Sequence, residues 1–230
     1  MKDPLVSICI PAYNHAAYVR ECIESVMAQD YQNIELLVID DGSTDDTWDR
    51  IQELRERCAQ RFVRVVMRTR ENRGRMRTFA ELFGEVRGEL YGDIASDDRY
   101  LPGAISRLVR IFCDDEGVGL AVGRNRIIDA CGRRCFWDAD RQIVYDRSAA
   151  RYESLDDLIE EGAGFDLSGA DFGSYRRLCS GNHVPNGALK KAAFVRRVRA
   201  FDERAPLEDL WFHLQLSKVA RYAYLPEDVF

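Results

Sequence analysis

The chain has 230 residues, 46% of them hydrophobic, which is enough to bury one sizeable core in one large domain or two small ones. Its formal net charge of −6 argues against a nucleic-acid-binding protein that relies on a basic surface. The sequence has no run of about 18 apolar residues, and it passes from Lys2 directly into a strand-like segment, so we predict neither a transmembrane segment nor a secretory signal.

The seven cysteines are scattered from Cys9 to Cys179 without a CxxC motif. This odd number without paired spacing is typical of reduced thiols in a cytoplasmic protein. Cys131 and Cys135 are close in sequence, and we expect them to flank a hairpin turn rather than to bind zinc. We therefore predict a cytoplasmic protein.

The first part of the chain alternates apolar runs with amphipathic helical patterns. Residues 5–10 form a nearly continuous apolar run that Pro11 should end, and Asn14 is a candidate N-cap for the helix that follows. A second apolar run at residues 34–39 is followed by another helical pattern that extends to Cys58. Two strand–helix units in succession predict a right-handed parallel crossover.

This alternation continues to residue 122 and predicts an open, mostly parallel sheet covered by helices on both faces. In such sheets ligands bind at the carboxyl ends of the strands, where Pro11, Asp41 and Asp97 all fall. The remaining expected elements are a strand at 63–67, a helix from Gly74 to Gly88, a strand at 89–94, a helix that begins near Pro102 and a strand at 118–122.

Beyond residue 123 the alternation stops. Two short runs that flank residues 130–133 predict a hairpin, and residues 138–182 are polar and arginine-rich, which we interpret as a variable substrate-side segment. The elements that we expect after the hairpin are a short helix near 155–159, a helix at 192–198, a helix that begins near Pro206 and a last strand at 221–225. The end at Phe230, shortly after this last strand, is compatible with a catalytic fragment of a longer chain.

Asp97 and Asp98 follow an apolar strand and precede Pro102. Adjacent carboxylates at a strand end suit Mg²⁺ or Mn²⁺, and such a cation is most useful when its other ligands are the phosphate oxygens of a nucleotide-diphosphate substrate. The alternative is that the two aspartates start a turn and cap the helix after Pro102. These residues alone leave both interpretations open.

The chain resembles the family 2 glycosyltransferases of the GT-A fold. The resemblance covers nearly the whole chain and depends on the order and spacing of four motifs. It implies an α/β fold of the GT-A type, with a Rossmann-like, mostly parallel sheet, helices on both faces and a smaller acceptor-side region. It also implies one domain, residues 1–230, with a nucleotide-sugar-binding half at 1–123 and an acceptor-binding half at 124–230. The motifs are VSICIPAYN at 6–14, DDGSTD at 40–45, ASDD at 95–98 and ED at 208–209.

The resemblance implies a nucleotide sugar, and we favour a UDP-sugar, as the donor. Pro11 and Tyr13 would form a wall of the nucleotide pocket, where Tyr13 could pack against the base or the ribose. Asp41 would accept hydrogen bonds from a uracil-type base, as the family uses the second aspartate of this motif. A tight turn with an Asn cap is an equally good interpretation of Asn14 taken alone.

Arginines are dense between Arg61 and Arg77, and we choose Arg75 and Arg77 as the residues that could reach the donor diphosphate. A solvated helix face is the alternative for most of these arginines. The family often has an arginine further along this helix, where this chain has Phe79. The resemblance therefore does not assign the diphosphate to one residue.

The metal motif of the family is usually Asp-x-Asp, and here Ala95 stands where its first aspartate is expected. Some members of the family share this departure, so Asp97 and Asp98 could divide ribose binding and the ligation of Mg²⁺ or Mn²⁺. Weaker metal binding is the alternative. A nucleotide-sugar-binding or scaffold domain without turnover is the extreme case.

Glu208 and Asp209 stand at the expected start of a helix, where a carboxylate is also favoured by the helix dipole. The resemblance gives Asp209 the role of general base and leaves Glu208 to orient it or to contact the acceptor. Of the three histidines, His183 lies in the expected acceptor loop as a candidate contact for acceptor or metal. We expect His15 and His213 to be helix residues without a chemical role.

Taken together, the resemblance implies a metal-dependent inverting glycosyltransferase of the hexosyltransferase type. The acceptor would be a carbohydrate or glycolipid hydroxyl in the synthesis of a cell-surface polysaccharide or glycan, with no nucleic-acid partner. Peripheral association with the inner face of the membrane is compatible with the absence of a span. The alternatives are an impaired nucleotide-sugar-binding scaffold and a nucleotidyltransferase, although the glycine-rich basic loop of the latter is missing after the first strand.

Overall fold

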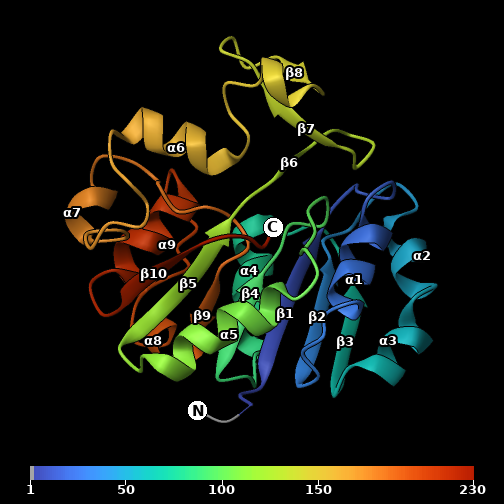
Figure 1. Cartoon of the computed structure of the whole chain (residues 1–230). Coiled ribbons are helices and arrows are strands. Elements are labelled where there is room, and N and C mark those ends of the chain that lie inside the picture. Colours follow the sequence, from blue (N-terminus) through green and yellow to red (C-terminus); the bar gives the residue numbers. More distant parts are fainter. Residues whose placement is uncertain (1–2) are drawn as a thin grey trace.

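The computed structural model describes residues 3–230 and shows a mixed α/β fold around a seven-stranded sheet (Figure 1). The strands lie in the order β10-β5-β9-β4-β1-β2-β3, and all of them run parallel except β9, which is antiparallel to β4 and to β5. The prediction of an open, mostly parallel sheet is therefore confirmed. The strands are β1 (Val6–Ala12), β2 (Ile34–Asp40), β3 (Arg64–Thr69), β4 (Leu90–Asp93), β5 (Val118–Arg124), β9 (Leu189–Lys191) and β10 (Arg221–Asp228).

Helices cover both faces of this sheet and divide the core into two layers. In β2, Leu36 and Val38 pack in the layer with α1, α3 and α5, whereas Leu37 and Ile39 pack in the layer with α4 and α9. Successive residues of a strand point to opposite faces, so a strand covered on both sides is apolar throughout. The helices are α1 (Val19–Met27), α2 (Thr47–Gln52), α3 (Arg55–Arg61), α4 (Arg75–Glu85), α5 (Ala104–Asp114), η1 (Arg147–Ala149), α6 (Leu155–Ala163), α7 (Tyr175–Leu178), α8 (Ala192–Val195) and α9 (Glu208–Leu216).

Strand β1 continues through Pro11, which we expected to end it. Pro11 pairs with Ile39 of β2, whereas the pairing of β1 with β4 ends at Cys9. A proline is tolerated in a strand where no neighbouring strand needs its missing N–H. The strand therefore carries Ala12 as well to the edge of the sheet where ligands bind.

Asn14 also departs from expectation, because the N-cap of α1 is Tyr18. Asn14 has a φ of 53°, and its side-chain oxygen accepts a hydrogen bond from the backbone N of Thr44 at 2.8 Å. Its own backbone N donates to Ser43 Oγ at 2.9 Å. Asn14 therefore fastens the loop after β1 to the loop after β2, which fixes these two strand ends relative to each other.

The chain beyond β5 forms the expected hairpin and four elements that were not predicted. β6 (Ile127–Ile128) and β7 (Arg134–Trp137) pair antiparallel and form, with β8 (Ile143–Val144), a small sheet that projects from the body of the protein (Figure 1). Helix α6 extends beyond the predicted 155–159, and helix α8 is shorter than the predicted 192–198. Strand β8, the short helix η1, helix α7 and strand β9 were not predicted. None of the helices within residues 3–230 is long and apolar enough to cross a membrane.

Candidate functional site

A cleft of about 610 Å³, here named the strand-end cleft, lies where β1, β2 and β4 end. Its volume falls in the range of small-molecule sites, which is roughly 300–1,000 Å³. The loops after these strands and the start of α4 supply its walls. The lining residues are Pro11, Ala12, Tyr13, His15, Asp41, Asn72, Gly74, Arg75, Thr78, Phe79, Ala95, Ser96, Asp97 and Asp98.

Six residues that the sequence analysis selected for the donor or the metal meet in this cleft: Pro11, Tyr13, Asp41, Arg75, Asp97 and Asp98. Tyr13 is 46% exposed, so its ring is accessible to a ligand. Arg77 lies elsewhere: its Nε donates to Glu203 Oε1 at 2.8 Å, and it does not line the cleft. Arg75 is therefore the arginine of this helix that the structure places beside the carboxylates.

Asp41 is buried and held in one orientation. Its Oδ1 accepts a hydrogen bond from the backbone N of Arg73 at 2.8 Å and forms an ion pair with Arg70. Arg70 also donates to Glu81 Oε2 at 3.0 Å and to Thr78 Oγ1 at 2.8 Å. No hydrogen bond to Asp41 Oδ2 occurs within residues 3–230 of the structure, so this oxygen is the one available to a ligand.

Arg70 was not predicted as a site residue, although the order of the strands indicates its position. Arg70 directly follows β3 and Asp41 directly follows β2, and these two strands are parallel neighbours. Gly42 brings the loops closer still, because a Cβ at this position would lie 2.7 Å from the backbone N of Asn72. With a φ of 72°, Gly42 also has a backbone conformation that other residues rarely adopt.

Asp97 and Asp98 lie at the other side of the strand-end cleft, in the loop after β4. Burial, and then the charge of Asp97, raise the pKa of the Asp98 carboxyl to about 6. His15 Nδ1 lies 2.8 Å from Ser96 Oγ and 3.7 Å from Asp97 Oδ1. The expectation that His15 is a helix residue without a chemical role was wrong about its place, because it precedes α1 and lines the cleft.

The chemistry of this aspartate pair fits Mg²⁺ or Mn²⁺. Both cations take oxygen ligands, and Mg²⁺ is commonly held by one or two carboxylates together with phosphate oxygens and water. A nearby cation would also offset both the burial and the charge of Asp97 that raise the pKa of Asp98. Within residues 3–230 no group of three or more His, Cys, Asp and Glu side chains is placed to hold a metal.

Glu208 and Asp209 open helix α9 and are both paired with Arg75. Arg75 Nη2 lies 3.0 Å from Asp209 Oδ1 and 3.1 Å from its Oδ2, and Arg75 Nη1 lies 2.9 Å from Glu208 Oε1. The side chains of Arg75 and Asp209 are 55% and 59% exposed. The guanidinium of Arg75 also lies over the ring of Phe79, 5.5 Å from its centroid.

A second cavity of about 190 Å³, here named the side cavity, adjoins the strand-end cleft. The two share Arg75, Phe79, Ala95 and Asp98, and the side cavity adds Asp209 and part of the segment 182–190. His183, a candidate for acceptor or metal, does not line either cavity, and its ring instead packs at 5.4 Å from that of Phe165.

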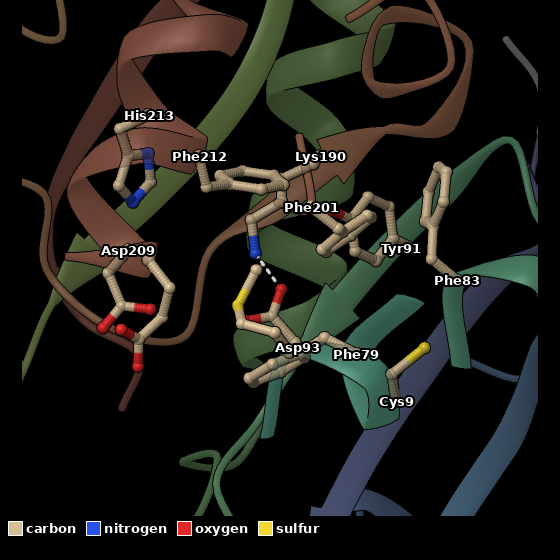
Figure 2. Close-up of a pocket in the computed structure, with 12 residues that line it drawn as sticks. Cys9, Phe79, Phe83, Tyr91, Asp93, Lys190, Phe201, Asp209, Phe212 and His213 are labelled. Carbon is tan, nitrogen blue, oxygen red and sulfur yellow. Dashed lines mark hydrogen bonds and ion pairs between the residues drawn. The ribbon is translucent and has the colours of Figure 1, made fainter. Parts of the chain in front are cut away.

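A third cavity of about 60 Å³, here named the aromatic cavity and drawn in Figure 2, adjoins the side cavity, with which it shares Phe79, Asp93, Lys190, Asp209 and His213. The buried Lys190 of β9 points at Asp93, the last residue of β4, and forms an ion pair with it. Burial, and then the charge of Lys190, lower the pKa of His213 to about 3, so its ring is neutral at pH 7. The lining residues are Cys9, Met76, Phe79, Phe83, Tyr91, Asp93, Lys190, Phe201, Glu208, Asp209, Phe212 and His213.

The sequence analysis missed the pair of Asp93 and Lys190. Asp93 stands in an otherwise apolar segment, but Lys190 is followed by Lys191 and lies 97 residues from Asp93, so nothing in the sequence pairs the two charges. His213 does belong to a helix, as expected, but it also lines both the side cavity and the aromatic cavity.

Comparison with known protein sequences gives one family and several relatives. The family model described as "Glycosyl transferase family 2" matches residues 7–172. A chondroitin synthase from Escherichia coli is 36% identical over 129 residues, which are 56% of this chain and 18% of that protein. An uncharacterized glycosyltransferase from Nostoc sp. is 32% identical over 115 residues, 50% of this chain and 35% of that protein. The chain thus spans about a third or less of the length of these two relatives.

Solved structures match over almost the whole chain. A mannosyltransferase from Pyrobaculum calidifontis, in complex with GDP-Man and Mn²⁺, has a TM-score of 0.70 at 15% identity and covers 98% of this chain and 56% of its own. Residues 1–349 of Staphylococcus aureus TarS, in complex with UDP-GlcNAc, have a TM-score of 0.65 at 17% identity and cover 98% of this chain and 57% of their own. At these identities the likeness shows the fold.

Proposed function

The chain belongs to glycosyl transferase family 2 and has the GT-A fold, and from that premise we propose that it is an inverting glycosyltransferase that uses a UDP-sugar. One observation carries the proposal. The strand-end cleft and the side cavity meet at Arg75, and Arg75 pairs with Asp209. A donor in the cleft and an acceptor in the side cavity would therefore meet beside a carboxylate.

We assign the base of the nucleotide to the part of the strand-end cleft near Asp41 and Tyr13. Arg70 and the backbone N of Arg73 both contact Asp41 Oδ1, so the available Oδ2 can accept the imide N–H of a uracil. The exposed ring of Tyr13 can pack against the base or the ribose, while Pro11 shapes the wall beside it. A carboxylate acceptor suits a base that presents an N–H donor, as the imide of uracil does.

We assign the diphosphate to the opposite part of the cleft, with Asp97 and Asp98 as the residues that would hold Mg²⁺ or Mn²⁺. When bound there, the cation would neutralise the charge that develops on the departing diphosphate. Arg75 lines the same cleft and can donate to a phosphate oxygen, once it leaves Asp209. Arg77 is directed at Glu203, so the proposal relies on Arg75.

We assign the proton transfer to Asp209, with Glu208 beside it to orient the acceptor. The acceptor hydroxyl gives its proton to the Asp209 carboxylate as its oxygen forms a bond to the anomeric carbon. The bond between that carbon and the diphosphate oxygen breaks in the same displacement, so the anomeric configuration inverts. No covalent intermediate with the protein is required.

The acceptor in this proposal is a carbohydrate or glycolipid hydroxyl, as in the synthesis of a cell-surface polysaccharide or glycan. The division into a nucleotide-sugar half at 1–123 and an acceptor half at 124–230 belongs to the same proposal. A second candidate is a nucleotide-sugar-binding scaffold without turnover. It is favoured by Ala95, which lines both the strand-end cleft and the side cavity where relatives usually have a carboxylate.

Calorimetry of UDP binding, with and without Mn²⁺, tests the donor assignment. We expect Mn²⁺ to strengthen UDP binding about tenfold or more in the native protein, a difference of about 1.4 kcal/mol, and to have little effect in Asp98→Asn. Asp140→Asn, which replaces an exposed aspartate in the β7–β8 turn, is the matched control. The donor assignment would be refuted if UDP does not bind, or if it binds only at millimolar concentration and Mn²⁺ does not change its affinity. Tight binding without hydrolysis or transfer across a panel of donors would favour the scaffold.

A further inference from the structure

The aromatic cavity contains an ion pair between the buried Lys190 and the partly exposed Asp93, which the proposed mechanism does not use. Lys190 is 4% exposed, and its Nζ lies 5.2 Å from the ring centroid of Tyr91 and 5.5 Å from that of Phe212. Removing two charges from water is unfavourable, and apolar residues of similar volume are often as stable or more stable. A buried pair at the edge of a substrate cavity is therefore a candidate for ligand recognition.

The pair presents one hydrogen-bond donor and one acceptor side by side, without net charge. An ammonium group has three N–H donors, and Lys190 directs one at Asp93 and one at the carbonyl of Ala188, 3.5 Å away. The Asp93 side chain is 34% exposed and lines both the aromatic cavity and the side cavity. His213 is neutral and adds no charge. The group that fits is uncharged, with one acceptor and one donor close together.

The size and walls of the cavity restrict this group further. With a volume of about 60 Å³, the aromatic cavity is much smaller than the strand-end cleft of about 610 Å³ and lies below the roughly 300–1,000 Å³ of whole small-molecule sites, so it fits a substituent rather than a whole sugar. Aromatic rings line most of the space beyond the ion pair (Figure 2), and such walls favour a methyl group over water. The ligand group is therefore short, with its polar atoms at one end and an apolar group at the other.

We propose that the aromatic cavity binds the acetamido group of an N-acetylated amino sugar. The carbonyl oxygen accepts a hydrogen bond from Lys190, the amide N–H donates to Asp93, and the methyl group lies among the aromatic rings. The inference rests on the proposed function, because Glu208 and Asp209 line the same cavity and place the sugar at the reacting end of the site. Two sugars could carry the group, the acceptor or the sugar of the donor.

Saturation-transfer NMR with two pairs of probes distinguishes these sources. The acceptor pair is methyl 2-acetamido-2-deoxy-β-glucopyranoside and methyl β-glucopyranoside, measured in the presence of UDP and Mn²⁺. The donor pair is UDP-GlcNAc and UDP-glucose. In the pair that uses the cavity we expect the acetamido compound to bind about tenfold or more tightly, with the strongest saturation on its acetyl methyl protons, because two hydrogen bonds and a buried methyl are added.

The variant that tests the assignment replaces both charged residues, Asp93→Leu with Lys190→Met. Replacing the pair together avoids a lone buried charge, which keeps the variant folded. Lys191→Met is the matched control: it changes the next residue of β9, whose Nζ donates to the carbonyl of Glu116 at 2.6 Å on the other face of the sheet. We expect the double variant to lose the preference for the acetamido probe and the Lys191→Met variant to keep it.

Calorimetry of UDP with Mn²⁺ on the same samples separates failure of the inference from failure of the proposed function. If UDP binds but neither acetamido probe is preferred, or if the double variant keeps the preference, the inference is overturned and the donor assignment stands. If the acetamido preference is present and sensitive to the double variant but UDP does not bind, the cavity assignment stands and the donor assignment falls. If neither UDP nor an acetamido probe binds, both are overturned.

Discussion

Two arginines from one short segment hold two site carboxylates in opposite environments. The side chains of Arg70 and Asp41 are 13% and 7% exposed, whereas those of Arg75 and Asp209 are 55% and 59% exposed. An ion pair between exposed side chains contributes only about 0–1 kcal/mol, while breaking a buried pair is strongly unfavourable. The comparison teaches that the side with Asp41, which we propose to bind the nucleotide, is fixed together with the fold, and that the side with Asp209, which we propose to bind the acceptor, can rearrange.

This difference suits the proposed division of labour between the two sides. Asp41 must present one oxygen to a base in a constant direction, and its second oxygen is held by Arg70 and by a backbone N–H. Asp209 must release Arg75 and bind an acceptor hydroxyl in its place. An ion pair between exposed side chains can break at little energetic cost. Three substitutions test this contrast, and a fourth tests a buried carboxyl that has no arginine partner.

The largest expected effect is on the exposed side. Asp209→Asn should reduce the rate of sugar transfer about 10²- to 10⁴-fold, because the amide cannot accept the proton, while UDP affinity and thermal stability remain near those of the native protein. Rates measured by mass spectrometry and UDP affinity measured by calorimetry check this. Glu203→Gln is the control, since it breaks the similarly exposed pair with Arg77 away from the cleft. An active Asp209→Asn enzyme would refute the role of Asp209.

The next effect is on the buried side. Arg70→Met should lower the free energy of unfolding by about 3 kcal/mol, because it leaves the Asp41 charge buried without its partner, and it should weaken UDP binding. Urea denaturation and calorimetry measure the two effects. Arg70→Met combined with Asp41→Asn should recover part of the stability and none of the UDP affinity. Equal stability of Arg70→Met and the native protein would contradict the contrast between the two pairs.

A third carboxyl is buried without an arginine and should depend on pH. Asp156 of α6 accepts hydrogen bonds from the backbone N of Asn125 and the hydroxyl of Tyr224, both at 2.7 Å, and burial raises its pKa from 3.8 to about 6. Between these values the folded protein holds a proton that the unfolded chain releases, so the contribution of Asp156 to stability falls as the pH rises from about 4 to 6.

The comparison of native protein with Asp156→Asn isolates this contribution. The amide is neutral at every pH, and the Tyr224 hydroxyl can turn to accept from it. Relative to this variant, the native protein should lose stability of the order of 2 kcal/mol as the pH rises from 4 to 6, and the difference should then remain constant up to pH 8. Urea denaturation at several pH values measures it. If the difference in stability does not change between pH 4 and 8, the pKa of Asp156 is not raised in the folded protein.

The smallest expected effect on stability is that of Arg75→Gln. Because both partners of the pair with Asp209 are exposed, the free energy of unfolding should change by less than about 1 kcal/mol. UDP affinity should fall, since the proposed contact with the diphosphate is lost. A loss of stability as large as that of Arg70→Met would mean that the acceptor side is as fixed as the nucleotide side.

The nucleotide side could be predicted from the sequence because simple periodicity determines it. Apolar runs identify parallel strands, and the residues that follow parallel neighbours meet at one edge, which brought Asp41, Asp97 and Asp98 together. Helical periodicity alone did not separate Arg75 from Arg77. Two residues apart on α4, they face different directions, and only tertiary packing decides which of them faces the cleft.

The acceptor side could not be predicted in the same way. Lys190 and Asp93 are 97 residues apart, and they meet because β9, which has only three residues, pairs between β4 and β5. A strand this short carries no periodic pattern that sequence analysis can detect. Arg70 could have been found from the order of the strands, whereas Lys190 required the three-dimensional pairing.

The position of β9 has a consequence for how the protein is made. Until residues 189–191 leave the ribosome, β4 and β5 have no strand between them, and each presents an unpaired edge in the middle of the future sheet. Long-range pairing of this kind is slow, and open edges attract other chains. We therefore expect nascent chains that stall before β9 to aggregate, and the aromatic cavity to be among the last parts of the protein to form.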